Sequence, residues 1–285
     1  MAAPFVLGVA LLVAAPAVAT VTLALFDYDL VRSPRFIGLD NFAELADDDV
    51  FRISLRNSMA FVALSVPLRL GGALAAALLL HRRTRLAAAG RTAVFLPSVV
   101  PDVAYGLVWL WLLNPLYGPV NVVLGAVGAP TPSWLTEPVA AQAAVVLIGA
   151  FQIGEGMVIT LAARRSLPDE LYETAVLEGY RPWALFRRIT LPLLAPTLLL
   201  LAFRDVVHAF QSSFVPALVV TGGGPPPFST TYLPLFVYRT GFEYLRYGYA
   251  AAATVVMLGV TALMIVAQWG VVRRRGTGTG PGSHR

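Results

Sequence analysis

Apolar residues fill six long stretches of the chain, and shorter polar segments separate them. The stretches cover about residues 2–26, 55–80, 92–113, 138–163, 193–220 and 248–272. A run of roughly 18 or more apolar residues is long enough to cross the hydrocarbon core of a bilayer as a helix. The pattern therefore predicts an all-α membrane protein, with six transmembrane helices in a single domain over residues 1–285.

The first stretch has a second interpretation as a secretory signal peptide, because Ala17, Val18 and Ala19 resemble a cleavage site. No basic residue precedes the stretch, and the apolar run continues past Ala19 before the mixed, polar segment 27–54 begins. Both features favour a membrane span over a cleaved leader.

The composition agrees with a membrane protein and limits its chemistry. Hydrophobic residues make up 57% of the chain and charged residues 13%, whereas about 25% charged residues are typical of soluble domains. Cysteine is absent, which excludes disulfides and thiolate metal sites. All 21 residues of the Lys and Arg class are arginine, so the chain lacks the lysine of a Walker A phosphate loop. If ATP powers this protein, another polypeptide must bind the ATP.

The arginines predict the orientation of the spans. They are dense in segments 81–91 and 164–192 and in the tail after residue 272, whereas segment 114–137 has none. Cytoplasmic loops carry an excess of Arg and Lys, so we expect the Arg-dense segments and both termini to be cytoplasmic. The net charge of +5 also suits a nucleic-acid partner. Because the arginines lie between spans, we interpret them as topology signals and expect no nucleic acid.

Five charged residues lie inside the apolar stretches. They are Arg69, Asp102, Glu155, Arg204 and Asp205. A helix rise of 1.5 Å per residue places all of them roughly 14–20 Å from the cytoplasmic ends of their spans. A charge at the centre of a membrane helix costs roughly 2.5–3.5 kcal/mol and needs a partner or a water-filled cavity. The layer is therefore either a substrate pathway or a set of ion pairs between spans, such as Glu155 with Arg204.

The fifth stretch is the most polar of the six. Arg204, His208, Gln211 and Ser212 recur at steps of three and four residues and share one helix face. Their donors and acceptors suit the hydroxyls of a sugar. The candidate pathway residues are Asp102, Glu155, Arg204, His208, Gln211 and Ser212. Because His208 has no second membrane histidine beside it, we predict no metal site, and the sequence indicates no catalytic residue.

Proline and glycine interrupt two of the stretches. Pro97 and Pro101 are expected to break the third stretch, and Gly154 and Gly156 allow close helix approach or a local break in the fourth. Transporters use such breaks to line cavities with free backbone groups. Kinks that serve only helix packing are an equally good interpretation.

The polar segment between the fourth and fifth stretches predicts two short helices around one turn. Ser166 suits an N-cap and Pro168 a first helical position. Gly179 lies where a glycine in the left-handed region would end the first helix. Pro182 is placed to start the second helix, and Pro192 and Pro196 are expected to limit it.

The same segment resembles the cytoplasmic coupling loop of bacterial ABC importer permeases. The matching residues are Glu173, Ala175, Gly179, Ile189, Leu191 and Pro192, with Thr174 in place of the second family residue. The family pattern is Glu-Ala-Ala, three residues, Gly, nine residues and Ile-x-Leu-Pro. Two further segments, 36–42 and 218–225, resemble carbohydrate-importer permeases of the maltose, trehalose and glycerol-3-phosphate type.

This resemblance implies a permease subunit of an ATP-driven carbohydrate importer in the bacterial cytoplasmic membrane. It implies a helical hairpin between spans four and five in which Glu173 contacts an arginine of an ATPase subunit and Gly179 makes the turn. The implied partners are a second, related permease, two ATP-binding subunits that hold ATP and Mg²⁺, an extracytoplasmic solute-binding protein and the membrane lipid. The chain itself would be neither an enzyme nor a cofactor carrier.

Two alternatives stay open at the level of the sequence. Glycerol 3-phosphate and glycerophosphodiesters are carried by similar permeases. An ion-coupled secondary transporter would use Asp102, Glu155 and Asp205 as its coupling acids. An intramembrane enzyme is not supported, because neither His-Glu-x-x-His nor Gly-x-Ser-x-Gly occurs in the sequence.

Overall fold

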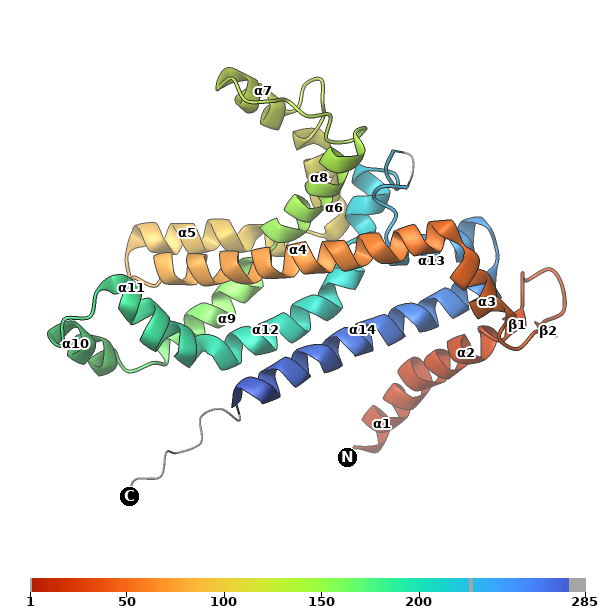
Figure 1. The fold of residues 1–285 in the computed structure, drawn as a ribbon, viewed down its shortest axis with the longest axis horizontal. Coiled ribbons are helices and arrows are strands. Elements are labelled where there is room, and N and C mark those ends of the chain that lie inside the picture. Colours follow the sequence, from red (N-terminus) through yellow and green to blue (C-terminus); the bar gives the residue numbers. More distant parts are fainter. Residues whose placement is uncertain (1, 226–227, 277–285) are drawn as a thin grey trace. The chain divides into compact units, whose positions relative to one another are not determined.

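The structure is a computed structural model that describes residues 2–225 and 228–276, with side chains as far as Gly270 (Figure 1). The predicted tail beyond residue 276 lies outside the described residues. Close contacts between Cα atoms divide the chain into two compact units. We call Met1–Ser58 with Pro226–Arg285 the terminal unit, and Met59–Pro225 the central unit. The single domain expected from the sequence stays a prediction.

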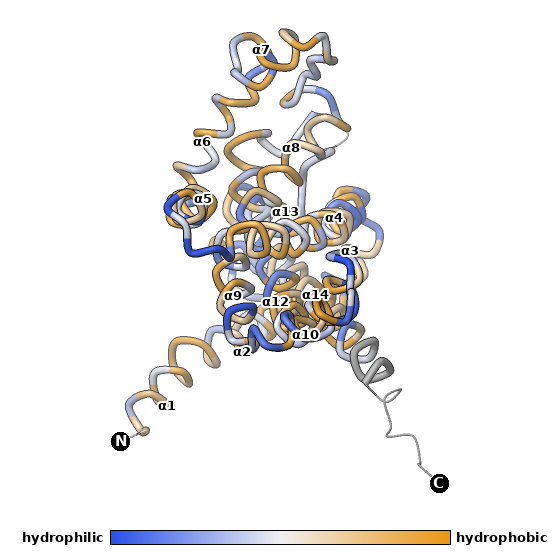
Figure 2. Tube along the Cα trace, turned by 90° about the vertical axis from the view of Figure 1, so that its left-hand side faces the viewer, coloured by the Kyte–Doolittle hydropathy of each residue, from blue (hydrophilic) through white to orange (hydrophobic). Residues whose placement is uncertain are grey.

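The described residues of the terminal unit form helices and one short strand pair. Its elements are α1 (Ala3–Val9), the π-helical turn η1 (Ala10–Ala14), α2 (Ala15–Leu23), β1 (Phe26–Asp27), β2 (Arg35–Phe36), α3 (Asp40–Asp47), the first residues of α4 (Asp49–Leu79), α13 (Leu233–Tyr238), the π-helical turn η5 (Arg239–Glu243) and α14 (Tyr247–Gly276). The strands pair antiparallel, with Phe26 opposite Phe36. Figure 2 shows polar residues gathered at α3 and apolar colouring along α1.

The start of α14 holds the terminal unit together. This helix packs against α2, α3 and α13, and its residues Ala250 to Ala253 are buried. A side chain at Gly248 would collide with the carbonyl oxygen of Phe26, so only glycine permits this approach. The buried amide of Asn41 donates to the carbonyls of Ala24 at 2.8 Å and Phe26 at 3.0 Å. Segment 27–54, for which the sequence predicts only polarity, is therefore folded.

The central unit contains the remaining helices. They are the rest of α4, α5 (Arg85–Phe95), the 3₁₀ turn η2 (Leu96–Ser98), α6 (Asp102–Leu112), α7 (Pro119–Ala126), α8 (Pro138–Phe151), α9 (Gly154–Arg165), α10 (Asp169–Leu177), α11 (Pro182–Leu185), the π-helical turn η3 (Phe186–Thr190), α12 (Leu191–Ser212) and the π-helical turn η4 (Pro216–Val220). One apolar cluster joins Ala77, Met157 and Leu161, from α4 and α9, and Val94 of α5 packs on it. The helix α7 was not predicted.

The described residues contain four helical segments long and apolar enough to cross a membrane, or six if two bent pairs each count as one span. The four are Ala3–Leu23, Asp49–Leu79, Pro182–Val220 and Tyr247–Gly270, and the pairs are Arg85–Ser98 with Asp102–Leu112, bent by 103°, and Pro138–Phe151 with Gly154–Arg165, bent by 41°. Each predicted stretch overlaps one of them. The prediction of an all-α membrane protein is confirmed, and the third stretch is broken at Pro101 as expected.

Two helices begin earlier than the apolar runs suggest. The predicted second span starts at 55, whereas α4 begins at Asp49 because the Asp48 carboxylate accepts hydrogen bonds from the backbone N–H of Val50 and Phe51. The predicted loop 81–91 contains the start of α5, which is capped by the Thr84 hydroxyl. Apolar runs mark the part of a helix that lipid can cover, and capped polar turns extend the helix beyond it.

The predicted hairpin forms, with two corrections to its ends. Gly179 has φ +80°, and the N–H groups of Gly179 and Tyr180 bond to the carbonyls of Val176 and Ala175, which is the Schellman pattern that ends a helix. Pro182 starts the second helix as predicted. At the other end, Pro168 is the N-cap residue of α10 and not its first helical residue. The hydroxyl of Ser166 donates to the carbonyl of Ala163 within the preceding turn, so its predicted N-cap role is wrong.

Pro192 does not limit the second helix, contrary to the sequence prediction. The helical segment continues from Pro182 to Val220 with Pro196 inside α12, and the π-helical turn η3 ends at Thr190, two residues before Pro192. A proline ring clashes with the preceding helical turn and lacks an N–H donor, and a π-turn widens the helix at that point. The predicted boundary at residue 192, between the coupling loop and the fifth span, is therefore not a break in the helix.

Gly154 is a site where packing leaves no room for a side chain. A Cβ atom there would clash with the Ser98 hydroxyl and lie 2.8 Å from the Cα atom of Phe95. We expect Gly154→Ala to lower the free energy of unfolding by about 1–3 kcal/mol, the usual range for overpacking. The measurement is the melting temperature of the purified protein.

The matched control is Gly71→Ala in α4, where a Cβ would meet no atom within 4 Å. Alanine is favoured over glycine in a helix by roughly 0.5–1 kcal/mol, so this variant should melt at the wild-type temperature or above it. Equal melting temperatures for the two variants would contradict the packing argument.

Candidate functional site

Three helices of the central unit bring four charged side chains together. Asp205 of α12 accepts hydrogen bonds from the adjacent Arg204, at 2.9 Å from Nη2, and lies 3.9 Å from Nη2 of Arg69 on α4. Arg204 also reaches Glu155 of α9, with 3.0 Å between Nη1 and Oε2. We call these four residues the charge cluster. The ion pair between Glu155 and Arg204, one of the interpretations of the sequence, is present.

The members of the charge cluster differ in burial, and this decides what each pair contributes. The side chains of Arg69 and Asp205 are only 5% and 4% exposed, whereas Arg204 and Glu155 are 35% and 60% exposed. A buried charge without a partner is costly, so removing one member of the buried pair costs about 3–5 kcal/mol. An exposed pair contributes only about 0–1 kcal/mol. Asp205 is therefore the structural centre of the cluster.

Two acids stand at the starts of half-helices. Asp102 is the first residue of α6, after the 103° bend, and Glu155 is in the first turn of α9, after the 41° bend. The N-terminal end of a helix carries free N–H groups and a partial positive charge, which stabilise a nearby carboxylate. The breaks in the third and fourth spans thus have a common result, because each presents an acid at a helix N-terminus.

The two acids line one pocket with part of the charge cluster. The pocket has a volume of about 80 Å³, and its walls are Arg69, Ser98, Asp102, Gln152, Glu155 and His208. The sequence-based candidates Asp102, Glu155 and His208 are therefore brought together. Ser98 and Gln152 were missed, although Ser98 follows Pro97 and Gln152 precedes Gly154, which marked the two breaks.

The remaining candidates lie around this pocket. Ser212 lines a much smaller neighbouring pocket together with Asp102 and Gln152. Arg204 reaches Glu155 from outside the first pocket, and Gln211 is exposed and lines neither of these two pockets. The face shared by Arg204, His208 and Gln211 on α12 is consistent with the predicted spacing. The pathway role of these residues stays a prediction.

The polar groups of this pocket suit hydrogen bonding to a solute. The Nε atom of Arg69 and the hydroxyl of Ser98 are buried, without a hydrogen-bond partner among the described residues. Buried polar groups are normally paired, so such atoms are positions where a solute or water can bind. Across the described residues, no group of three or more His, Asp or Glu side chains is arranged to hold a metal ion.

The hairpin formed by α10 and α11 has a fixed inner side and an open outer side. Ala175 is buried, the Arg164 guanidinium lies 3.8 Å from the centre of the Tyr172 ring, and the Tyr172 hydroxyl lies 3.3 Å from the Thr190 hydroxyl. Glu173 and Gly179 are exposed. The predicted residues at the other end are Ile189 and Leu191, which are half-buried, and Pro192, which is exposed.

Several large apolar side chains of the hairpin are also exposed. Val176 is 62% exposed, Leu177 88% and Trp183 69%. A polar segment with such a patch is typical of a surface that meets another protein.

The comparisons with known proteins identify the family. Residues 69–276 match the family of binding-protein-dependent transport system inner membrane components. The chain belongs to this family. The matched range includes the charge cluster and the hairpin, and the resemblance found in the sequence is confirmed.

Relatives with assigned names agree with this membership. A probable ABC transporter permease protein of Bacillus subtilis, YesP, is 32% identical over 92% of this chain and 85% of its own. The lactose transport permease LacF of Rhizobium radiobacter is 30% identical over 85% and 82%. The sn-glycerol-3-phosphate transport permease UgpA of Agrobacterium fabrum is 30% identical over 85% and 83%.

A solved structure shares the fold. A chain of a bacterial alginate ABC transporter, crystallised with its alginate-bound periplasmic protein, superposes with a TM-score of 0.80 at 23% identity, covering 95% of this chain and 92% of that one. The permease is accordingly a multi-pass membrane protein of the carbohydrate ABC importer type.

The burial difference in the charge cluster gives a testable prediction. Asp205→Asn leaves Arg69 buried without its charged partner, and we expect it to cost about 3–5 kcal/mol of unfolding free energy. Glu155→Gln removes the exposed carboxylate of the pair with Arg204 and should lower the free energy of unfolding by no more than about 1 kcal/mol. Thermal denaturation of the purified variants measures both changes in stability. A larger loss of stability for Glu155→Gln than for Asp205→Asn would contradict the assignment of Asp205 as the structural centre of the cluster.

Proposed function

We propose that this permease is one of two related permease subunits in an ATP-driven importer that moves a carbohydrate across the bacterial cytoplasmic membrane by alternating access. The observation that carries the proposal is the continuous helical segment Pro182–Val220. It contains both the second half of the hairpin and the charge-cluster residues Arg204 and Asp205. A force applied at the hairpin therefore reaches the cluster without crossing a loop.

The hairpin is the proposed docking site for an ATP-binding subunit. The chain has no lysine for a phosphate loop, so ATP and Mg²⁺ bind to partner subunits, of which we propose two. The exposed Val176, Leu177 and Trp183 supply apolar contact area, and Glu173 supplies a carboxylate for an arginine of the partner. The Schellman turn at Gly179 fixes the end of α10.

ATP binding would shift the importer between inward- and outward-facing states. A ligand shifts such an equilibrium only if it binds the two states with different affinity. The ATP-binding subunits would hold the hairpin differently in the two states, and a solute-binding protein would deliver the carbohydrate to the opposite face. The arginine distribution supports this orientation, with the hairpin and both termini in the cytoplasm.

The charges around the membrane pocket favour a neutral sugar over glycerol 3-phosphate. Asp102, Glu155 and Asp205 contribute three carboxylates, and Arg69 and Arg204 contribute two guanidinium groups. With His208 counted as neutral, the group has a net charge of −1. Both guanidinium groups already face carboxylates, so a phosphate would meet a net repulsive field. Relatives of equal identity are named for lactose and for sn-glycerol-3-phosphate, so the proposal of a neutral sugar is supported by these charges and not by the relatives.

Uptake into proteoliposomes tests the proposed function. The permease, its second permease, the two ATP-binding subunits and the solute-binding protein should together accumulate a neutral saccharide when ATP is supplied. Glycerol 3-phosphate in excess should not compete with that uptake. ATP-independent uptake by the isolated chain would instead support an ion-coupled secondary transporter, and competition by glycerol 3-phosphate would support the phosphate alternative.

The coupling role of Glu173 can be tested by charge reversal. We expect Glu173→Arg to abolish ATP-driven uptake while the subunit still inserts, because the carboxylate needed by the partner arginine becomes a like charge. Glu170→Arg changes another exposed acid of α10 that the family pattern does not include, and should retain most of the uptake. Equal uptake by both variants would remove Glu173 from the coupling surface.

A further inference from the structure

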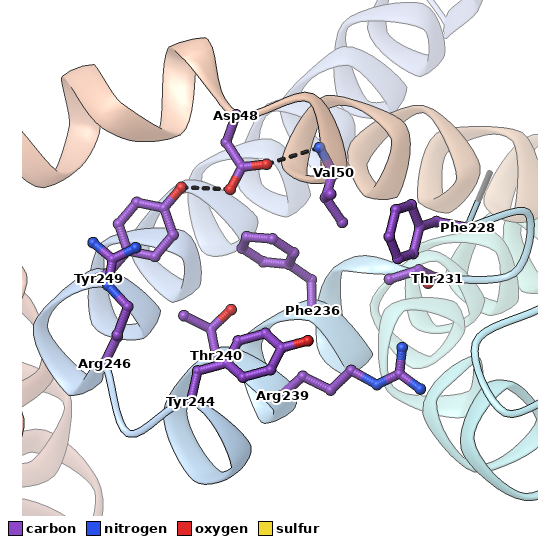
Figure 3. Close-up of a pocket in the computed structure, with 10 residues that line it drawn as sticks. All are labelled: Asp48, Val50, Phe228, Thr231, Phe236, Arg239, Thr240, Tyr244, Arg246 and Tyr249. Atoms are coloured by element: carbon purple, nitrogen blue, oxygen red, sulfur yellow. Dashed lines mark hydrogen bonds between the residues drawn. The ribbon is translucent and has the colours of Figure 1, made fainter. Parts of the chain in front are cut away.

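The terminal unit contains a pocket that the proposed transport mechanism does not use. Figure 3 shows ten side chains around it, from the junction of α3 and α4, the segment 228–231, α13, the segment 239–246 and the start of α14. Its volume is about 230 Å³. The deep wall is formed by Phe236, Thr240 and Tyr249, which are all buried. The rim includes Phe228 at 44% and Tyr244 at 65% exposure.

The charged groups that line this pocket already have partners, and two of these partners, Glu44 and Glu243, lie outside the lining. Arg246 donates two hydrogen bonds to Glu44, at 2.8 and 2.7 Å, and these bonds raise the pKa of Arg246 above its ordinary value. The Tyr249 hydroxyl donates to Asp48 at 2.8 Å (Figure 3). Arg239 lies 3.7 Å from Glu243. Because each guanidinium faces a carboxylate, the pocket has no excess positive charge to attract an anion.

The uncharged part of the lining suits a sugar ring. Phe236 and Tyr244 offer aromatic faces against which the C–H face of a sugar can pack, and the hydroxyls of Thr240 and Tyr244 can exchange hydrogen bonds with sugar hydroxyls. Such a mixture, mostly apolar with a few fixed polar groups, is typical of small-ligand sites. The volume lies below the roughly 300–1,000 Å³ of sites for drug-sized ligands, so it fits one ring and not an oligosaccharide.

The position of the pocket along the chain agrees with a role in substrate arrival. Its residues lie at the start of the second span, between the fifth and sixth spans, and at the start of the sixth. The topology predicted from the arginines assigns these segments to the non-cytoplasmic side of the membrane, where a carbohydrate would arrive. The pocket shares no residue with the pocket at the charge cluster.

We propose that this outer pocket of the terminal unit binds a single neutral sugar ring. The proposal rests on the proposed carbohydrate transport for its ligand class, and on the aromatic and hydroxyl lining for its location. The pocket would hold one ring of the carbohydrate weakly.

Binding can be measured by saturation-transfer NMR on the full-length chain in nanodiscs of zwitterionic lipid. The probes are D-glucose, D-galactose and D-mannose, with sn-glycerol 3-phosphate as the anionic comparison. We expect Tyr244→Ala to weaken binding of at least one hexose about two- to tenfold, the range that loss of one aromatic contact produces. Glycerol 3-phosphate should give no signal that depends on Tyr244.

The matched control is Phe242→Ala. Phe242 belongs to η5, which Tyr244 directly follows, and both side chains are 65% exposed. The Phe242 ring lies against Tyr238 and Tyr247 and does not line the pocket. This variant should bind the hexose as wild type does. Melting temperatures of both variants identify any general loss of folding.

Three outcomes would overturn the proposal. They are no hexose binding that depends on Tyr244, an equal loss in Phe242→Ala, and a Tyr244-dependent signal from glycerol 3-phosphate alone, which would indicate a lipid-headgroup or phosphate site. Uptake is measured separately. Saccharide uptake without binding in this pocket would contradict the pocket proposal and not the importer function. Binding without uptake would contradict the importer function and not the pocket proposal.

Discussion

The buried pair of Arg69 and Asp205 is the constraint on which the central unit depends. A guanidinium in the middle of an apolar helix is stable only beside a counter-charge, so α4 has to lie where α12 can present Asp205. Asp205 in turn orients Arg204, and Arg204 reaches Glu155 on α9. One buried carboxylate therefore fixes which faces of three helices meet. Gly154 helps these helices to meet, because the absence of a side chain lets the start of α9 approach η2 closely.

The two interpretations of the intramembrane charges are compatible with one another. The ion pairs between helices exist, and some of their members also line a pocket together with Asp102, Ser98 and Gln152. Pairing keeps the charged groups stable in the absence of solute, and the breaks after Ser98 and Phe151 bring polar groups into the same region. Buried polar groups in lipid need partners, and the ion pairs supply them for the charged groups, whereas the Nε atom of Arg69 and the hydroxyl of Ser98 have none among the described residues.

The sequence predicts features that depend on local chemistry and misses those that depend on distant partners. The six apolar stretches, the left-handed turn at Gly179 and the start at Pro182 all follow from short-range rules, and they are confirmed. The ion pair of Glu155 with Arg204 could be named because both residues are rare types at similar depth. The outer pocket could not be predicted, since Asp48 and Tyr249 meet across about two hundred positions of sequence. The continuation past Pro192 was also missed, because a proline lacks a backbone N–H donor and is expected to end a helix, whereas Pro67 and Pro196 also lie inside helices of this chain.

The length of the segment Pro182–Val220 has a further consequence. Its 39 residues extend over about 58 Å at 1.5 Å per residue. The hydrocarbon core of a bilayer is about 30 Å thick, so nearly half of this helix must lie outside it. Asp205 lies about 35 Å along the helix from Pro182, measured at the same rise. A tilt of roughly 10° about Asp205 corresponds to a lateral shift of about 6 Å at the hairpin end, by the same helix geometry. A rotation small enough to keep Arg69 beside Asp205 therefore moves the hairpin end of the helix by as much as the length of a side chain.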